Sequence, residues 1–161
     1  RFQLLLSGAP PIPVGDKLYI YYRGTARRHA KVPREFDPRI AHDQDPGTMA
    51  IGLATLRLDG FASMNASFDG GSVTTRPFLL AGDELRVNVK SDYGKLVAEL
   101  LDLEGKAIPG FASGDCVEIL KDAVSAPINW RGEQDLRKLR GKPVSIRFSL
   151  ENARLYAYWC A

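Results

Sequence analysis

The chain has 161 residues, of which 45% are hydrophobic and 25% are charged, and its formal net charge is +3 at pH 7. This length fits one domain, or one domain and part of another, and the composition is that of a globular protein and not of a disordered one. The small net charge argues against a nucleic-acid-binding protein. Apolar runs such as those at residues 4–6 and 79–81 are far shorter than the roughly 20 residues that a transmembrane helix needs.

Apolar and polar residues alternate along several short segments, which is the pattern of half-buried β-strands. In chain order, this pattern predicts strands at residues 17–22, 49–58, 72–80, 84–90, 95–102, 144–150 and 155–160. We expect Ser91–Gly94 to join the fourth and fifth of these strands in a hairpin. One short helical segment is expected at residues 133–139, because Leu136 and Leu139 have helical spacing and Gly141 follows.

Short strands separated by Gly, Pro and Asp turns favour an all-β fold, an antiparallel sandwich or barrel, over an α/β fold. In the last strand, Leu155, Ala157 and Trp159 are expected to share one face, and Tyr156, Tyr158 and Cys160 the other. Residues 24–48 stand apart as a long excursion between two strands, and loops of this length are usually functional or disordered.

Three stretches together resemble a known family. Pro10–Gly24 (PPIPVGDKLYIYYRG) resembles a strand pair of a β-propeller glycosidase blade, and Ile51–Ser63 (IGLATLRLDGFAS) resembles the strand that closes a last blade. Gly141–Phe148 and Ala153–Trp159 resemble the closing strands of a β-sandwich appended to such propellers. The chain thus resembles the C-terminal part of a bacterial glycoside-hydrolase-like protein with a five-bladed propeller.

The resemblance implies blade-like strands at residues 1–60, with the long loop 24–48, and a jelly-roll-like antiparallel β-sandwich at residues 61–161. It implies packing against a preceding propeller domain and a periplasmic or secreted location. Glycoside hydrolysis needs two carboxyl groups at a defined separation, and propeller glycosidases collect theirs from several blades. Because at most one blade is present, we assign no catalytic residue and no cofactor, and we expect a non-catalytic accessory module.

The chain has several aromatic residues that are candidates for contact with carbohydrate, because flat rings pack well on the C–H faces of pyranoses. The aromatic candidates are Tyr22, Trp130, Tyr156, Tyr158 and Trp159, and Arg23 is added to them as part of a basic cluster that could bind an anionic saccharide. The alternative is that these rings fill the core or a seam with a neighbouring domain. If the rings are exposed on one surface, the chain is a self-contained carbohydrate-binding domain.

Four further features of the sequence bear on function or assembly. The carboxylates of Glu35 and Asp43 in the long loop would allow this chain to complete a glycosidase site built mainly by absent blades. Alternate oxygens at Asp43 and Asp45 lack the rest of a calcium-binding loop, so no metal site is predicted. Cys116 and Cys160 form either one disulfide or two small buried thiols. Unpaired strand edges of the blade-like part would favour self-association.

Overall fold

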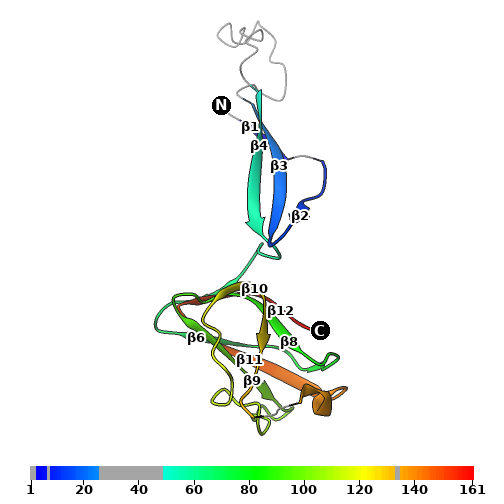
Figure 1. Ribbon diagram of the computed structural model, residues 1–161, viewed down its shortest axis with the longest axis vertical. Helices are drawn as coiled ribbons and strands as arrows, with labels where there is room; N and C mark the ends of the chain where they lie inside the picture. The colour runs from blue at the N-terminus through cyan, green and yellow to red at the C-terminus, as the bar shows by residue number, and fades with distance from the viewer. Residues whose placement is uncertain (1–2, 7, 26–48, 133–134) are drawn as a thin grey trace, which may run out of the picture. The chain divides into compact units, whose positions relative to one another are not determined.

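The computed structural model describes residues 3–6, 8–25, 49–132 and 135–161 (Figure 1). The regular secondary structure of the described part is almost entirely antiparallel β-sheet, which confirms the predicted all-β fold class. Its one helical element is a 3-10 helix at Leu136–Leu139, and none of its helices is long and apolar enough to cross a membrane. The chain divides into two compact units, Arg1–Leu58 (unit 1) and Asp59–Ala161 (unit 2).

Unit 1 is a small antiparallel sheet built around one long strand. Its strands are β1 (Gln3–Leu6), β2 (Ile12–Val14), β3 (Lys17–Thr25) and β4 (Met49–Arg57). β4 pairs with the whole length of β3 on one side, while β1 and β2 pair with successive parts of β3 on the other. The two-residue turn between β2 and β3 contains Gly15, whose φ of 57° suits glycine in a tight hairpin.

The sheet of unit 1 carries apolar side chains on both faces. Residues that lie opposite one another in an antiparallel pair share a face. Leu6 therefore lies on the same face as Tyr22, and Ile51 lies on the other face with Arg23. Ile51 is 82% exposed and Leu6 is 77% exposed. Among the described residues of unit 1, the buried ones are Leu18 and Thr25, so this sheet has almost no core of its own.

Unit 2 is a sandwich of two four-stranded antiparallel sheets, which confirms the predicted sandwich. The first sheet has the order β10 (Asp122–Ile128), β8 (Leu85–Lys90), β12 (Ala153–Cys160) and β5 (Met64–Ala66). In the second, β11 (Pro143–Glu151) pairs with β9 (Lys95–Leu101) on one side and with β6 (Gly71–Thr74) and β7 (Phe78–Leu79) on the other. One cluster of buried apolar side chains lies between the sheets.

The predicted hairpin between residues 84–90 and 95–102 is wrong. β8 pairs with β10 and β12, whereas β9 pairs with β11 in the other sheet. The connection between β8 and β9 therefore crosses the sandwich. The buried hydroxyl of Ser91 donates to the carbonyl oxygen of Ile119, 2.7 Å away, and Gly94 packs so closely on the carbonyl of Glu151 that a side chain would not fit. These contacts hold residues 91–94 in a connection that leads from one sheet to the other, although their composition is that of a hairpin turn.

The predicted strand at residues 72–80 is interrupted. β6 ends at Thr74 and β7 begins at Phe78, and the gap contains Pro77, which has no N–H for a sheet hydrogen bond. The Thr75 hydroxyl replaces one ladder partner, because it accepts the backbone N–H of Ile146 at 3.0 Å. By contrast, the alternation predicted for residues 144–150 is confirmed, since Val144, Ile146, Phe148 and Leu150 are all buried.

The predicted division of faces in the last strand is wrong because β12 contains a bulge. Leu155 lies opposite Val89, and Ala157 lies opposite the next residue of β8, Asn88. Tyr156 is therefore the extra residue of the bulge, and no residue of β8 lies directly opposite it. A bulge of this kind turns the following side chains over. Tyr158 consequently shares the inner face with Leu155, and β10 has an irregularity opposite the same part of β8.

We predict that Phe148→Ala lowers the free energy of unfolding by about 3–5 kcal/mol, because Phe148 is fully buried between the two sheets and its loss leaves a cavity. Urea unfolding of the 161-residue chain, followed by circular dichroism, measures this change. Phe61→Ala is the matched control, since Phe61 is 71% exposed and its loss should change stability by about 0.5 kcal/mol or less. Equal losses for both variants would contradict the described core.

Candidate functional site

Trp130 is a core residue at one edge of the sandwich. Its side chain is only 7% exposed, and its indole N–H donates to the carbonyl oxygen of Ala98 at 3.1 Å. Its ring packs edge-on against Phe111, with the ring centroids 5.2 Å apart. Burial and a satisfied polar group leave little of this ring for stacking on a sugar.

The C-terminal aromatic residues do not form one platform. Tyr158 faces inward, with its ring centroid 5.3 Å from that of Phe148 and 6.2 Å from that of Phe78, although 38% of the residue is exposed. Trp159 lies on the outer face of the first sheet, opposite Arg86, and is partly buried. Tyr156 occupies the bulge between these positions and is also partly buried.

The two candidates in unit 1 also point to different faces of their sheet. The ring of Tyr22 lies over Gly52 on β4, at a distance that leaves no room for a side chain there. This contact gives Tyr22 a packing role within the sheet. Arg23 lies on the opposite face, across from Ile51, and is exposed. Glu35, Asp43 and Asp45 of the long loop lie outside the described residues.

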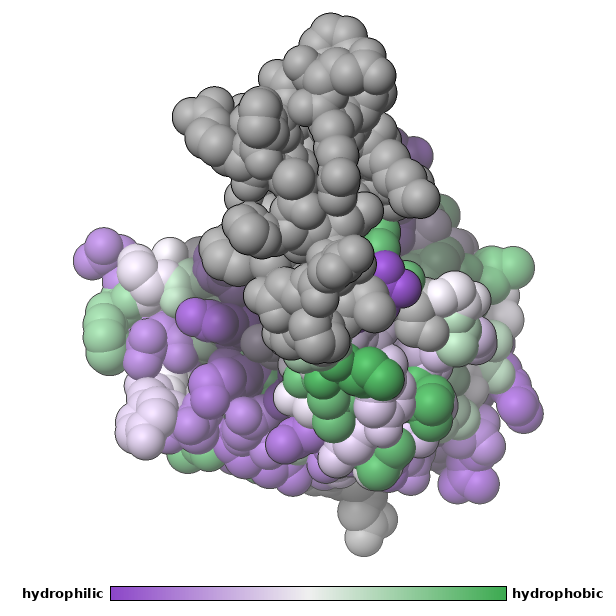
Figure 2. Space-filling view, turned by 90° about the horizontal axis from the view of Figure 1, so that it is seen from above, coloured by the Kyte–Doolittle hydropathy of each residue, from purple (hydrophilic) through white to green (hydrophobic). Residues whose placement is uncertain are grey.

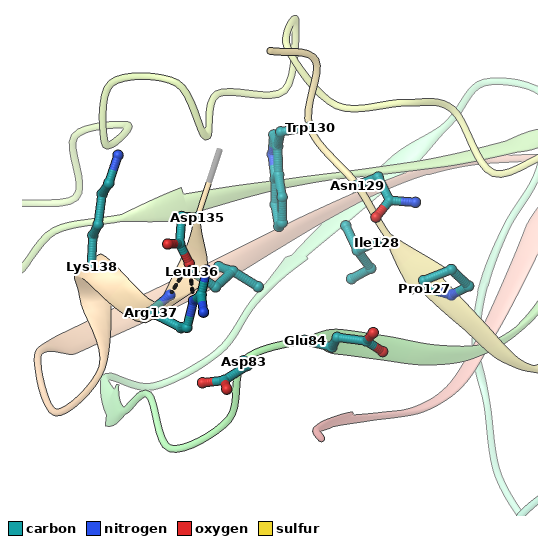
Figure 3. A pocket seen from close by; sticks show the side chains of 10 residues that line it. All are labelled: Asp83, Glu84, Pro127, Ile128, Asn129, Trp130, Asp135, Leu136, Arg137 and Lys138. Carbon is teal, nitrogen blue, oxygen red and sulfur yellow. Dashed lines mark hydrogen bonds and ion pairs between the residues drawn. The ribbon is translucent and has the colours of Figure 1, made fainter. Parts of the chain in front are cut away.

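A polar cleft of about 670 Å³ lies in unit 2 beside the 3-10 helix (Figure 3). Asp83 and Glu84, just before β8, form one part of its wall, and Asp135 and Arg137 form another. The Asp135 carboxylate caps the helix: it accepts hydrogen bonds from the side chain and the backbone N–H of Arg137, both at 2.9 Å. These bonds lower the pKa of Asp135, chiefly through the side-chain bond. The carboxylate is therefore held ionised, which is unsuited to a general acid.

A second concavity, of about 310 Å³, lies at one end of the sandwich. We call it the three-loop hollow. It is lined by Asn65, Ala66, Ser67, Lys90, Asp92, Tyr93, Asn152, Ala153 and Arg154. These residues come from three of the connections that cross between the sheets, namely β5 to β6, β8 to β9, and β11 to β12, and from the strand ends beside them.

Asn152 holds the three connections together. It is the single residue between β11 and β12, and its φ of 42° is a left-handed conformation that Asn tolerates better than most residues. Its backbone N–H donates to the carbonyl oxygen of Ser67 at 2.8 Å, and its side-chain amide donates to the carbonyl oxygen of Tyr93 at 2.7 Å. One turn therefore fixes the positions of the other two.

The hollow combines an exposed ring with charged and amide groups. Tyr93 is 79% exposed. The ammonium group of Lys90 lies 3.6 Å from Asp92 and 3.3 Å from Asp122, and these partners raise its pKa, with the hydrogen bond to Asp122 as the largest cause. The amide oxygen of Asn65 accepts a hydrogen bond from Ser63 at 2.8 Å, which orients the amide. A ring beside fixed polar groups is an arrangement that can bind a small polar ligand.

Sequence reasoning missed this site because Tyr93 lies in a turn and its neighbours come from distant parts of the chain. The one available signal was an aromatic residue among the small turn residues Ser91, Asp92 and Gly94. Elsewhere, many of the exposed hydrophobic side chains belong to the sheet of unit 1. Figure 2 shows hydrophobic side chains gathered on one part of the face that it presents, with polar residues around them.

Across the described ranges, no group of three or more His, Cys, Asp and Glu side chains is placed to hold a metal ion. Cys116 and Cys160 are both free thiols, and burial raises the pKa of Cys116. In the comparisons with known proteins, no family model, no curated protein and no solved structure matches this chain.

We predict that replacing Asn152 destabilises unit 2 in a graded way. Asn152→Ala loses the bond to Tyr93 and strains the left-handed backbone, so the free energy of unfolding should fall by about 2–3 kcal/mol. Asn152→Gly loses the bond but adopts the same φ freely, so its loss should be smaller, about 1–2 kcal/mol. Urea unfolding ranks the variants, and a glycine variant less stable than the alanine variant would contradict a role for backbone strain.

Proposed function

We propose that this chain is a non-catalytic accessory module that contacts carbohydrate through the three-loop hollow of unit 2. The observation that carries the proposal is the exposed ring of Tyr93 beside polar groups on connections that Asn152 fixes together. The resemblance noted above places such a module beside the propeller of a carbohydrate-processing protein outside the cytoplasm, and this context is part of the proposal.

Tyr93 supplies the flat apolar surface that one face of a sugar ring needs. Its side chain projects from a turn whose backbone is held by Asn152 and by the hydroxyl of Ser91. An anchored turn loses little conformational entropy when a ligand binds, and lower ordering costs favour affinity.

The groups around the ring suit the hydroxyls of a sugar. The amide oxygen of Asn65 is occupied by Ser63, so its NH2 group is left to donate. Asp92 offers carboxylate oxygens as acceptors, and Arg154 offers guanidinium donors. A few polar groups of fixed position beside an apolar surface give a pocket its orientation and specificity.

A non-catalytic role is also supported by the acidic cleft. Asp135 is bound by Arg137, and Asp83 lies 3.8 Å from the guanidinium of Arg140. The hydrogen bonds from Arg137 lower the pKa of Asp135, so this carboxyl is a poor candidate for a general acid that must donate a proton. The alternative that Glu35 or Asp43 completes a glycosidase active site concerns residues outside the described ones and stays a hypothesis.

A second candidate function, docking to a protein, is favoured by unit 1. The sheet of unit 1 has apolar side chains on both faces. This pattern is typical of strands that are covered by protein on both faces. We propose that β-sheets of the preceding domain flank it on both faces. The arginine and lysine side chains at its ends would then lie at the rim.

For carbohydrate contact, we predict that Tyr93→Ala weakens binding by about tenfold or more, because stacking on the ring is lost. Isothermal titration of the 161-residue chain with a panel of oligosaccharides measures the affinity. Phe61→Ala is the matched control, since Phe61 is also exposed but does not line the hollow. Heat from no sugar in the panel, or equal binding by wild type and Tyr93→Ala, would refute the proposed site.

For unit 1, we predict that the backbone amides of β3 and β4 exchange with deuterium much faster than those of β11 in the chain alone, because little apolar surface is buried over them. Addition of the preceding domain should slow this exchange while leaving β11 unchanged. Strong protection of β3 in the chain alone, as a monomer, would show a self-sufficient sheet and remove the basis for docking.

A further inference from the structure

We propose that the three-loop hollow selects sugars that carry an anionic group, and that Arg154 binds that group. This inference rests on the proposed carbohydrate contact and adds the class of ligand to it. The anionic group is either the carboxylate of a uronic acid or a sulfate ester, since both present the paired oxygens that a guanidinium fork recognises.

Arg154 differs from the other arginines on the strands of unit 2. Arg86 donates to Glu84 at 2.9 Å and to the hydroxyl of Ser125 at 2.7 Å, and Arg147 donates to Glu99 at 2.7 Å. The guanidinium of Arg154 forms no hydrogen bond or ion pair with any residue that the structure describes, and the residue is exposed. Its donors are therefore free for a ligand.

The residues around the Arg154 guanidinium do not neutralise its charge, which favours binding of an anion from outside the chain. In the first sheet Arg154 lies directly opposite Lys90 on one side and Asn65 on the other. Two cations directly opposite each other across a strand pair are destabilising. Lys90 is held between Asp92 and Asp122, 3.6 and 3.3 Å from its ammonium group, so these acids compensate the charge of Lys90 and not that of Arg154. An incoming anion would relieve the uncompensated charge of Arg154.

The placement also fits one sugar ring. Arg154 and Tyr93 line the same hollow of about 310 Å³, so a ring on Tyr93 can direct a substituent towards the guanidinium. The amide of Asn65, opposite Arg154, offers donors for a hydroxyl of the same ring or for the anion itself. Two contacts of different chemistry from one pocket would distinguish acidic sugars from neutral ones.

The experiment compares ligands that differ only in charge. Isothermal titration of the 161-residue chain is carried out at low salt with oligogalacturonate and with its methyl ester, and then with a sulfated galactan oligosaccharide and its desulfated form. We expect the anionic member of at least one pair to bind about tenfold more tightly or better. This preference should disappear in Arg154→Gln and be partly kept in Arg154→Lys, and raising the salt concentration should weaken it.

Arg76→Gln is the matched control, because Arg76 is an exposed arginine that does not line the hollow, and its loss should leave the preference intact. Whichever pair shows the preference identifies the anionic group. Equal affinity for charged and uncharged members of both pairs, or a preference that persists in Arg154→Gln, would overturn this inference. In that case binding that still requires Tyr93 would leave the proposed carbohydrate contact standing, whereas binding of no sugar would remove both.

Discussion

The passage of the chain from β11 to β12 through a single residue is the constraint on which unit 2 depends. β11 is the strand of the second sheet that pairs on both sides, and β12 lies between β8 and β5 in the first. Asn152 is therefore the single residue that joins a central strand of one sheet to a central strand of the other. Because the connection is so short, it fixes where the two sheets meet at this end. The other two connections of the hollow, β5 to β6 and β8 to β9, end at the same place because their strands are neighbours of β11 and β12.

The sequence was informative where one face of a strand is buried and the other is not. Val144, Ile146, Phe148 and Leu150 revealed β11 because each inward position is apolar. The partner of a strand is harder to predict, because Ser91–Gly94 has the composition of a hairpin turn and yet crosses between sheets. The bulge at Tyr156 was also hidden, since nothing in the local pattern marks a residue without an opposite partner.

The candidate site shows the same limit more strongly. Trp130 and Tyr158 were candidates because they are aromatic. In the structure, Trp130 is a core residue whose indole N–H is hydrogen-bonded, and the ring of Tyr158 faces inward against Phe148. Tyr93 and Arg154 come together only because of how strands β8, β12 and β5 are ordered. Strand order depends on long-range pairing, which no local pattern specifies, so the hollow could not be predicted before the fold was known.

The hollow is held by two residues, Asn152 and Ser91, whose hydrogen bonds all go to backbone carbonyl groups. Asn152 bonds to the carbonyl oxygens of Ser67 and Tyr93, and Ser91 bonds to the carbonyl oxygens of Ile119 and Lys121. Any amino acid presents the same carbonyl group, so exchanging the side chain at Tyr93 or Asp92 leaves these anchors in place. The side chains that line the hollow can therefore be exchanged, residue by residue, without rebuilding the scaffold that presents them.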